Sequence, residues 1–151
     1  MGSPLLPLPC AVTRQMVVAE ARSYLGTPFH DQARVKGVGI DCLGLLVGIA
    51  KTFKFADYDT TDYHIPNPKV MKQKLDEYLD PVPPSSIQVA DVLYLRSERS
   101  PQHLAVVVEI HPELRIVHAF NWPKVMKVVE TNAGEYWMRR LAGAYRFRGV
   151  I

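Results

Sequence analysis

A glycine-containing loop that runs directly into an apolar segment constrains the fold of this chain more than any other feature. Residues 37–50 read GVGIDCLGLLVGIA, and every residue from Leu43 to Ile49 is apolar or glycine. Asp41 is a good N-cap, so the sequence predicts a helix that begins beside Cys42. A helix without a polar face is a buried helix, and we therefore expect it in the middle of the domain, with only its first turn at a cleft.

Cys42 is the candidate nucleophile. In the first turn of a helix, free backbone N–H groups and the positive end of the helix dipole favour a thiolate over a thiol. An ordinary free cysteine is more often a small buried hydrophobe, but this one follows glycines and a capping aspartate. Gly44 and Gly48 lie four residues apart on one helix face, and we expect them to let a sheet approach closely.

Composition limits the class of protein. A chain of 151 residues with 48% hydrophobic and 22% charged residues fits one globular domain. The net charge is +3 and no dense run of Lys and Arg occurs, so we expect no nucleic-acid partner. No run approaches the roughly 18 apolar residues of a membrane span, and the N-terminus does not resemble a secretory signal. We therefore expect the protein to be made in the cytoplasm and not to insert into a membrane.

Helical patterns come first and strand patterns follow. Residues 1–12 form a proline-rich tail, and residues 13–151 are expected to form one domain. Helices are predicted from Thr13 to Leu25 and from Asn67 to Leu79, with a polar loop at 29–40, an irregular connection at 57–66 and a linker at 80–86. Strands are predicted at 89–95, 103–110, 114–120, 125–131 and 144–148. The prediction is an α+β fold, with the central helix packed on an antiparallel sheet of about five strands.

Two histidines lie where partners of the cysteine are expected. His103 opens the second predicted strand and His118 lies late in the third, and a turn at residues 111–113 makes these strands a hairpin. The two imidazoles should then be neighbours on one sheet face, directed toward the helix start. If the register differs, Asn121 or His30 is the next candidate for the third polar group. No paired-cysteine or paired-histidine spacing indicates a metal site, so none is predicted.

Several segments together resemble one known family. Residues 21–29 (ARSYLGTPF), 37–45 (GVGIDCLGL), 90–94 (ADVLY), 102–107 (QHLAVV) and 116–119 (IVHA) are similar to motifs of the NlpC/P60 cysteine peptidases. The loop with His30 and Gln32 before the Asp-Cys motif resembles the phage-tail branch of that family. The resemblance implies a papain-like α+β fold and hydrolysis of the γ-D-glutamyl to diamino-acid bond in peptidoglycan stem peptides.

The resemblance also assigns roles to residues. It implies Cys42 as nucleophile, His103 as base and His118 as the residue that orients the base. The loop before Cys42 is placed to form a wall of the cleft, and we expect the substrate-binding residues to be His30, Gln32, Asp41 and Leu43. The family more often has Ser or Ala where this chain has Leu43, and Gly-Asp where it has Ala90 and Asp91, which leaves the shape of the pocket beside Leu43 open.

The implied setting is a bacterial cell wall met by a phage tail. The expected partners are a peptidoglycan stem peptide as substrate and tail-tip or hub proteins, the expected location is the virion tail tip, and no cofactor is required. One alternative is a structural tail-assembly protein that uses a peptidase fold. Another is a secreted or cytoplasmic cell-wall amidase outside a phage.

Overall fold

The computed structural model describes residues 11–55, 68–96 and 102–151. Cys10, Asn67 and the connection expected at 57–66 lie outside the described residues. The elements that the structure describes are, in chain order, α1 (Arg14–Arg22), β1 (Arg34–Val35), β2 (Gly39–Ile40), α2 (Cys42–Thr52), α3 (Pro68–Tyr78), β3 (Leu79–Val82), the 3-10 turn η1 (Pro84–Ser86), β4 (Val92–Leu95), β5 (His103–Glu109), β6 (Arg115–Trp122), β7 (Val125–Asn132), α4 (Gly134–Met138) and β8 (Leu141–Phe147).

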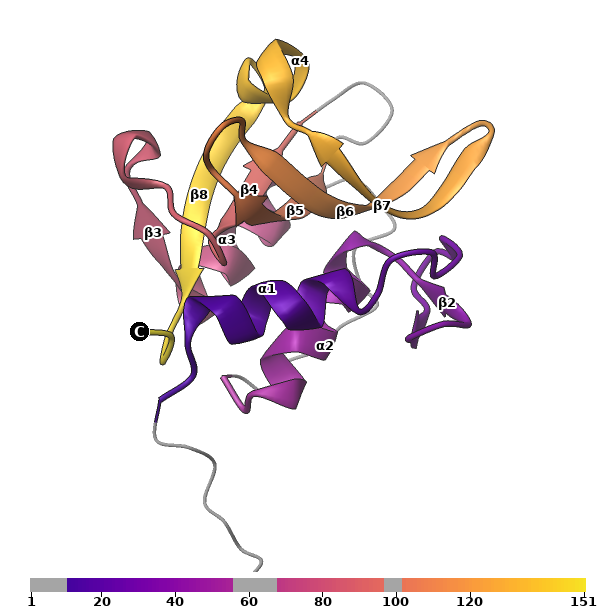
Figure 1. Cartoon of the computed structure of the whole chain (residues 1–151), viewed down its shortest axis with the longest axis horizontal. Helices are drawn as coiled ribbons and strands as arrows, with labels where there is room; N and C mark the ends of the chain where they lie inside the picture. Colours follow the sequence, from indigo (N-terminus) through magenta and orange to yellow (C-terminus); the bar gives the residue numbers. More distant parts are fainter. Residues whose placement is uncertain (1–10, 56–67, 97–101) are drawn as a thin grey trace, which may run out of the picture.

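A curved antiparallel sheet forms the centre of the molecule. In the described part of the chain it has six strands in the order β3-β8-β4-β5-β6-β7. Helices α1 and α2 cover one side of it, and the short helix α4 lies on the other (Figure 1). The predicted α+β arrangement is confirmed, with one strand more than expected.

The extra strand is β3, at the edge of the sheet. Prolines at 81, 83 and 84 predict a linker, but Leu79–Val82 pairs with β8, with Leu79 opposite Phe147. An edge strand tolerates proline because one side of its backbone needs no ladder hydrogen bond. The helix before it therefore ends at Tyr78 rather than Leu79.

Helix α1 begins where the sequence predicts and ends three residues earlier. The Thr13 hydroxyl accepts a hydrogen bond from the Met16 N–H at 3.1 Å, so Thr13 is the N-cap. The helix stops at Arg22 because the chain then turns toward the sheet: the Gly26 N–H donates to the Val128 carbonyl at 2.9 Å. Gly26 has a φ of +85°, a conformation that glycine adopts without strain.

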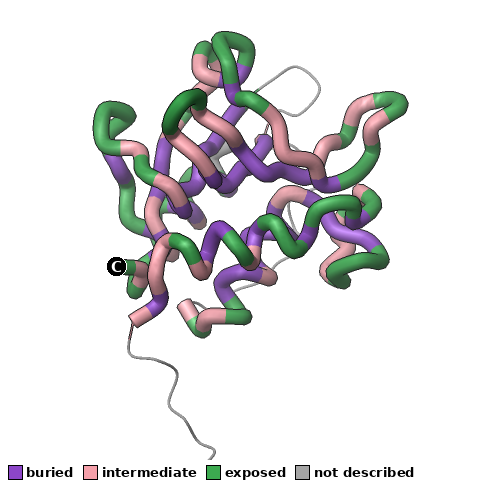
Figure 2. Tube along the Cα trace, in the orientation of Figure 1, coloured by how far each residue is buried: buried purple, intermediate pink, exposed green. Residues whose placement is uncertain are grey.

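Helix α2 is the buried central helix that the sequence predicts. Seven of its eleven residues are buried, with Leu45 and Ile49 0% exposed, and Figure 2 shows buried stretches of the trace in α2 as well as in α1 and the sheet. The expectation that a sheet approaches its two glycines holds for Gly44 only, and there the sheet is the small β1–β2 pair, through Ile40. A Cβ at Gly44 would lie 2.6 Å from the carbonyl oxygen of Ala33, and one at Gly48 would overlap the Tyr24 hydroxyl. The glycines therefore admit the β1–β2 segment and the Tyr24 ring, not the six-stranded sheet.

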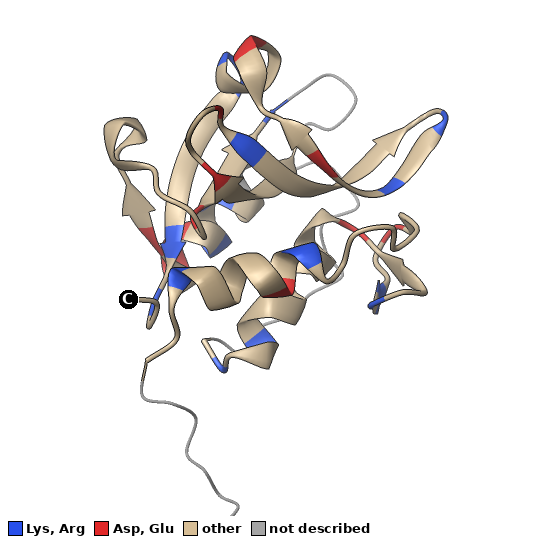
Figure 3. Cartoon of the chain, viewed as in Figure 1, with Lys and Arg blue, Asp and Glu red and all other residues tan. Residues whose placement is uncertain are grey.

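A buried carboxylate fastens the start of α1 to the sheet. Asp91 is 0% exposed, and both its oxygens lie 2.8 Å from the Arg146 guanidinium, while Arg14 approaches to 3.3 Å. Ala90, before it, has a φ of +76°, which explains why glycine suits this position. Elsewhere acidic and basic residues are interspersed in the view of Figure 3. Among the described residues, no helix is long and apolar enough to cross a membrane.

Candidate active site

The loop before α2 fixes the position of Cys42. Asp41 is 2% exposed, and its Oδ1 accepts a hydrogen bond from the Gly44 N–H at 2.8 Å, which confirms it as the N-cap. The other oxygen, Oδ2, accepts from the Gln32 N–H at 2.8 Å, and Arg34 Nη1 lies 3.0 Å from Oδ1. These bonds join the loop and the helix start into one unit, so the Cys42 side chain has a defined direction.

The Cys42 sulfur lies against the first residues of β5. Its Sγ donates to the Gln102 carbonyl oxygen at 3.6 Å, and the Leu104 N–H also faces the sulfur. Both contacts are to backbone on either side of His103. The helix start and the strand start therefore meet at the residue that the sequence nominates as the base.

Burial keeps Cys42 protonated at neutral pH. It raises the pKa of the thiol to about 12, and the Asp41 carboxylate acts in the same direction. Backbone N–H groups of Cys42, Leu43 and Leu104 lower the pKa, as expected at a helix start, but their effect is smaller. The expectation of a preformed thiolate is therefore corrected: desolvation outweighs the helix terminus.

The two predicted histidines are in contact. His103 Nε2 lies 2.7 Å from His118 Nδ1, and the residues are 3% and 0% exposed. They share one sheet face, as predicted, but it is the face of Trp137 on α4, whereas α2 packs on the opposite face with Leu104. Cys42 thus meets the backbone on both sides of His103 at the start of β5, and it does not approach the histidines across the sheet face.

Trp137 encloses the imidazole pair. Its ring stacks on His103 with centroids 5.0 Å apart and meets His118 edge-on at 5.6 Å. Burial lowers the pKa of His103 to about 4 and holds that of His118 well below its usual value, with the neighbouring His103 adding to the second effect. Both rings are therefore neutral at neutral pH. The sequence missed α4, since five residues give too short a pattern.

Thr131 is a further polar member of the site that the sequence reasoning missed. Its Oγ1 lies 2.8 Å from His118 Nε2, on the side of the ring away from His103. In the register of the β6–β7 hairpin, Ile116 is opposite Thr131 and His118 is opposite Val129, so Thr131 is a diagonal neighbour of His118. The two-residue turn at Pro123 and Lys124 was the signal that could have given this register.

The remaining predicted residues are less closely connected to the cysteine. His30 is exposed, and its Nδ1 lies 3.3 Å from the Asp31 carbonyl oxygen. Gln32 reaches the site through its backbone, whose φ of +60° turns the N–H onto Asp41. Leu43 is 9% exposed and lines an apolar cavity of about 60 Å³ between α2 and α3, facing away from the histidines' sheet face. Their substrate-binding roles stay predictions.

This arrangement is suited to acyl transfer. The Cys42 thiol contacts the backbone on both sides of His103, and His103 Nε2 is occupied by His118, so Nδ1 is the ring nitrogen left to accept a proton. Asn121 is exposed near the end of β6 and takes no part in the His103–His118 contact. Among the residues that the structure describes, no group of three or more His, Cys, Asp or Glu residues could hold a metal ion.

Comparisons with known proteins identify the fold. No protein-family profile and no curated protein sequence matches the chain. A lipoprotein-like NLP/P60 family protein from Staphylococcus aureus superposes with a TM-score of 0.61 at 22% identity, over 89% of this chain and 41% of its own. An NlpC/P60 family protein from Bacillus cereus superposes with a TM-score of 0.66 at 16% identity, over 93% of this chain and 41% of its own. The NlpC/P60 domain of the peptidoglycan hydrolase SagA superposes with a TM-score of 0.58 at 18% identity, over 89% of this chain and 98% of its own.

The extent of these matches differs. The chain spans 41% of the length of each of the first two structures, and it spans nearly the whole of the SagA domain. All three share a helix-and-sheet arrangement with this chain over about nine tenths of its residues. The chain therefore has the NlpC/P60 fold.

Proposed function

We propose that this chain is a cysteine peptidase that hydrolyses an amide bond of peptidoglycan stem peptides, of the γ-D-glutamyl to diamino-acid type. The observation that carries the proposal is the position of Cys42 Sγ against the backbone on both sides of His103, with His103 in turn bonded to His118 at 2.7 Å. The fold shared with a domain of a peptidoglycan hydrolase supports the choice of substrate.

The first half of the reaction starts from two neutral groups. Sγ of Cys42 attacks the amide carbon while its proton moves to Nδ1 of His103, so a thioether-like C–S bond forms and the carbonyl π bond becomes an oxyanion. The N–H of Cys42, at the first position of α2, is a donor for that oxyanion. His103 then gives the proton to the leaving amine, and the C–N bond breaks to leave a thioester.

The second half returns the enzyme to its starting state. A water molecule attacks the thioester carbon while His103 Nδ1 takes one of its protons. The C–S bond breaks, and that proton returns to the Cys42 sulfur as the carboxylic product leaves. His118 keeps the His103 ring oriented in both halves through its bond to Nε2.

The test is hydrolysis of defined muropeptides by the purified protein. We expect new amino groups and product masses that locate the cut at the γ-D-glutamyl bond, and Cys42→Ala should release nothing. EDTA should leave the rate unchanged because the nucleophile is a protein thiol. Loss of activity in EDTA with recovery on Zn²⁺ would contradict the mechanism, and an inactive wild-type protein on every wall type would favour the structural tail-assembly alternative.

The proposed setting is the tip of a phage or prophage tail. Its support is the resemblance of the loop with His30 and Gln32 to the phage-tail branch of the family. The gene's neighbours test it: tail genes on both sides are expected. An adjacent immunity gene, or a cell-wall recycling operon, would instead favour an amidase outside a phage.

A further inference from the structure

The hydrogen-bonded chain behind Cys42 is one residue longer than a triad. His103 Nε2 contacts His118 Nδ1 at 2.7 Å, and His118 Nε2 contacts Thr131 Oγ1 at 2.8 Å. His118 is 0% exposed, while Thr131 is partly exposed on the edge strand β7. A buried ring thus has each of its two nitrogens bonded to one neighbour, and each bond has a direction.

The two bond directions are coupled. A neutral imidazole has one N–H and one lone pair. If Thr131 accepts from His118 Nε2–H, then His118 Nδ1 accepts from His103 Nε2–H, and His103 Nδ1 carries a lone pair. If the Thr131 hydroxyl donates instead, both rings change tautomer and His103 Nδ1 carries a hydrogen. Only the first arrangement leaves His103 able to take the Cys42 proton.

Proton transfer itself selects the first arrangement. Once His103 holds a proton on each nitrogen, its Nε2–H must donate to His118 Nδ1, and neutral His118 must then donate Nε2–H to Thr131. The hydroxyl of Thr131 can accept this bond while its own hydrogen turns toward solvent, because the residue is partly exposed. An apolar side chain at 131 would leave a buried N–H without an acceptor.

We propose that Thr131 is a positioning residue that holds His103, through His118, in the tautomer that accepts the Cys42 proton. The part of this inference that concerns rate rests on the proposed peptidase function. The part that concerns tautomers does not, since it depends only on the three side chains and their two contacts.

The test compares Thr131→Val, which keeps the shape and removes the hydroxyl, with Thr131→Ser, which restores it. Long-range ¹H–¹⁵N NMR of histidine-labelled protein at neutral pH should show the Nε2–H tautomer for both rings in the wild type and in Thr131→Ser. In Thr131→Val we expect a shift of His103 and His118 toward Nδ1–H. The kcat on a muropeptide should fall about 10- to 100-fold with KM unchanged. Thr52→Val, whose hydroxyl bonds to Gly48 on α2, is the matched control.

Each outcome decides the proposal. A Thr131→Val protein with wild-type tautomers overturns it, whether or not its kcat falls, because a loss of rate alone would then be structural. A tautomer shift without a loss of kcat in an active enzyme overturns it as well. If the wild-type protein cleaves no muropeptide, the peptidase function has failed, and the tautomer shift and its recovery in Thr131→Ser still decide the role of Thr131.

Discussion

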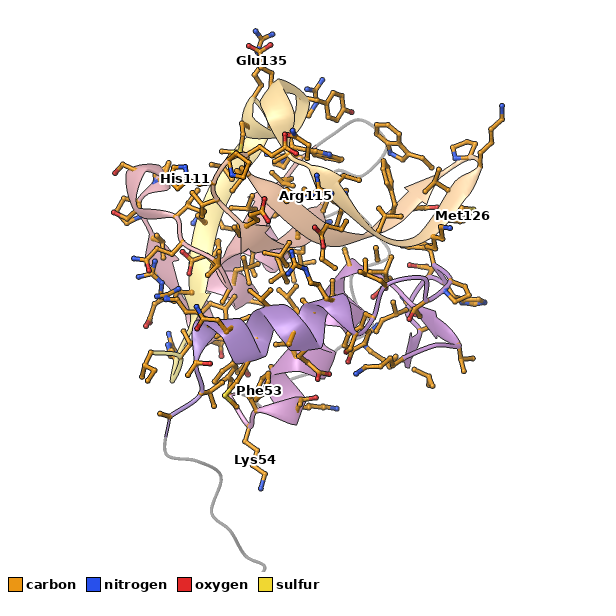
Figure 4. All side chains as sticks on the ribbon, viewed as in Figure 1. Phe53, Lys54, His111, Arg115, Met126 and Glu135 are labelled. Carbon is orange, nitrogen blue, oxygen red and sulfur yellow. The ribbon has the colours of Figure 1, made fainter. Side chains whose placement is uncertain are left out.

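The two sides of the sheet differ in chemistry. The side covered by α1 and α2 is apolar and mainly aliphatic, with Leu104 and Val106 of β5 packed with Leu45 of α2, all 0% exposed. The other side carries His103 and His118 among aromatic rings, beneath a helix of five residues. Figure 4 places Lys54, just after α2, and Glu135, on α4, at opposite ends of the molecule.

The two sides of the sheet have different roles: one contributes most to the free energy of folding, and the other holds the histidines of the site. Aliphatic side chains on the helix side bury the most apolar area and should dominate the free energy of folding. The aromatic side holds two neutral imidazoles away from water and brings one of them to the end of a strand. Cys42 joins the two sides, because it belongs to helix α2 and contacts the backbone beside His103 at the start of β5. Substitutions on the two sides should therefore have separable effects.

The largest expected effect is the loss of catalysis on removing Cys42 or its base. Cys42→Ala and His103→Ala should each lower kcat on a muropeptide by at least about a thousandfold, and the double variant should lose little more, since members of one catalytic unit fail together. The free energy of unfolding of Cys42→Ala should change by less than about 1 kcal/mol. Activity assays with urea unfolding of the same samples check both. A His103→Ala enzyme with near wild-type activity would remove His103 from the site.

The reverse pattern is expected on the helix side. Leu45→Ala deletes a fully buried side chain and should lower the free energy of unfolding by about 2 to 5 kcal/mol. The folded fraction should keep its kcat, since Leu45 faces away from the histidines. Leu25→Ala, at a site that is 44% exposed, is the control and should change stability by less than about 0.5 kcal/mol. Equal losses in both variants would contradict the assignment of the core.

Sequence patterns predicted the central helix and the histidine pair correctly. The cap at Asp41, the unbroken apolar run after it and the pairing of His103 with His118 follow from local periodicity, so they were predictable. Strand β3 was not, because its prolines also fit a linker and only pairing with β8 distinguishes the two.

The parts of the site that the sequence missed depend on tertiary packing. Thr131 is found only once the β6–β7 register is known, and Trp137 only once α4 folds back over the histidines. The protonation of Cys42 was predicted with the wrong sign because helix position is readable from sequence and desolvation is not. Long-range burial, rather than local pattern, therefore sets the electrostatics of the site.

The neutral imidazoles make stability depend on pH. The folded-state pKa of His103 is about 4 and its ordinary value is 6.5, so the unfolded chain takes up a proton first as pH falls. Neutral His103 contributes about 3 kcal/mol to the free energy of unfolding above about pH 6.5. This contribution is lost as the pH falls from about 6.5 to about 4. His118 adds to the loss in the same direction. Urea unfolding at several pH values should show a smaller pH dependence in His103→Gln, and an equal dependence would contradict the burial of His103.

Alkylation of Cys42 distinguishes a neutral thiol from a preformed thiolate. With the pKa of Cys42 raised to about 12, iodoacetamide should modify it at least about tenfold more slowly than free cysteine at pH 7.5, and the rate should increase steadily toward high pH. The Cys10→Ala variant leaves Cys42 as the single thiol, which makes intact-mass spectrometry sufficient. A fast rate that is constant from pH 5 to 8 would show a thiolate and restore the expectation drawn from the helix start.

The smallest expected effect concerns the hairpin that carries His118 and Thr131. Trp122 pairs with Val125, so Pro123 and Lys124 form a two-residue turn, and Lys124 has a φ of +77°. A side chain at this φ costs about 1 to 2 kcal/mol, part of which is offset in glycine by its larger loss of entropy on folding. Lys124→Gly should therefore raise the free energy of unfolding by up to about 1 kcal/mol and leave kcat unchanged. Lys127→Gly, an exposed lysine in β7 of the same hairpin, should lower it by a similar amount, because glycine weakens a strand. Thermal unfolding of both variants is the measurement. Equal losses of stability would contradict the claim that the backbone at Lys124 is strained.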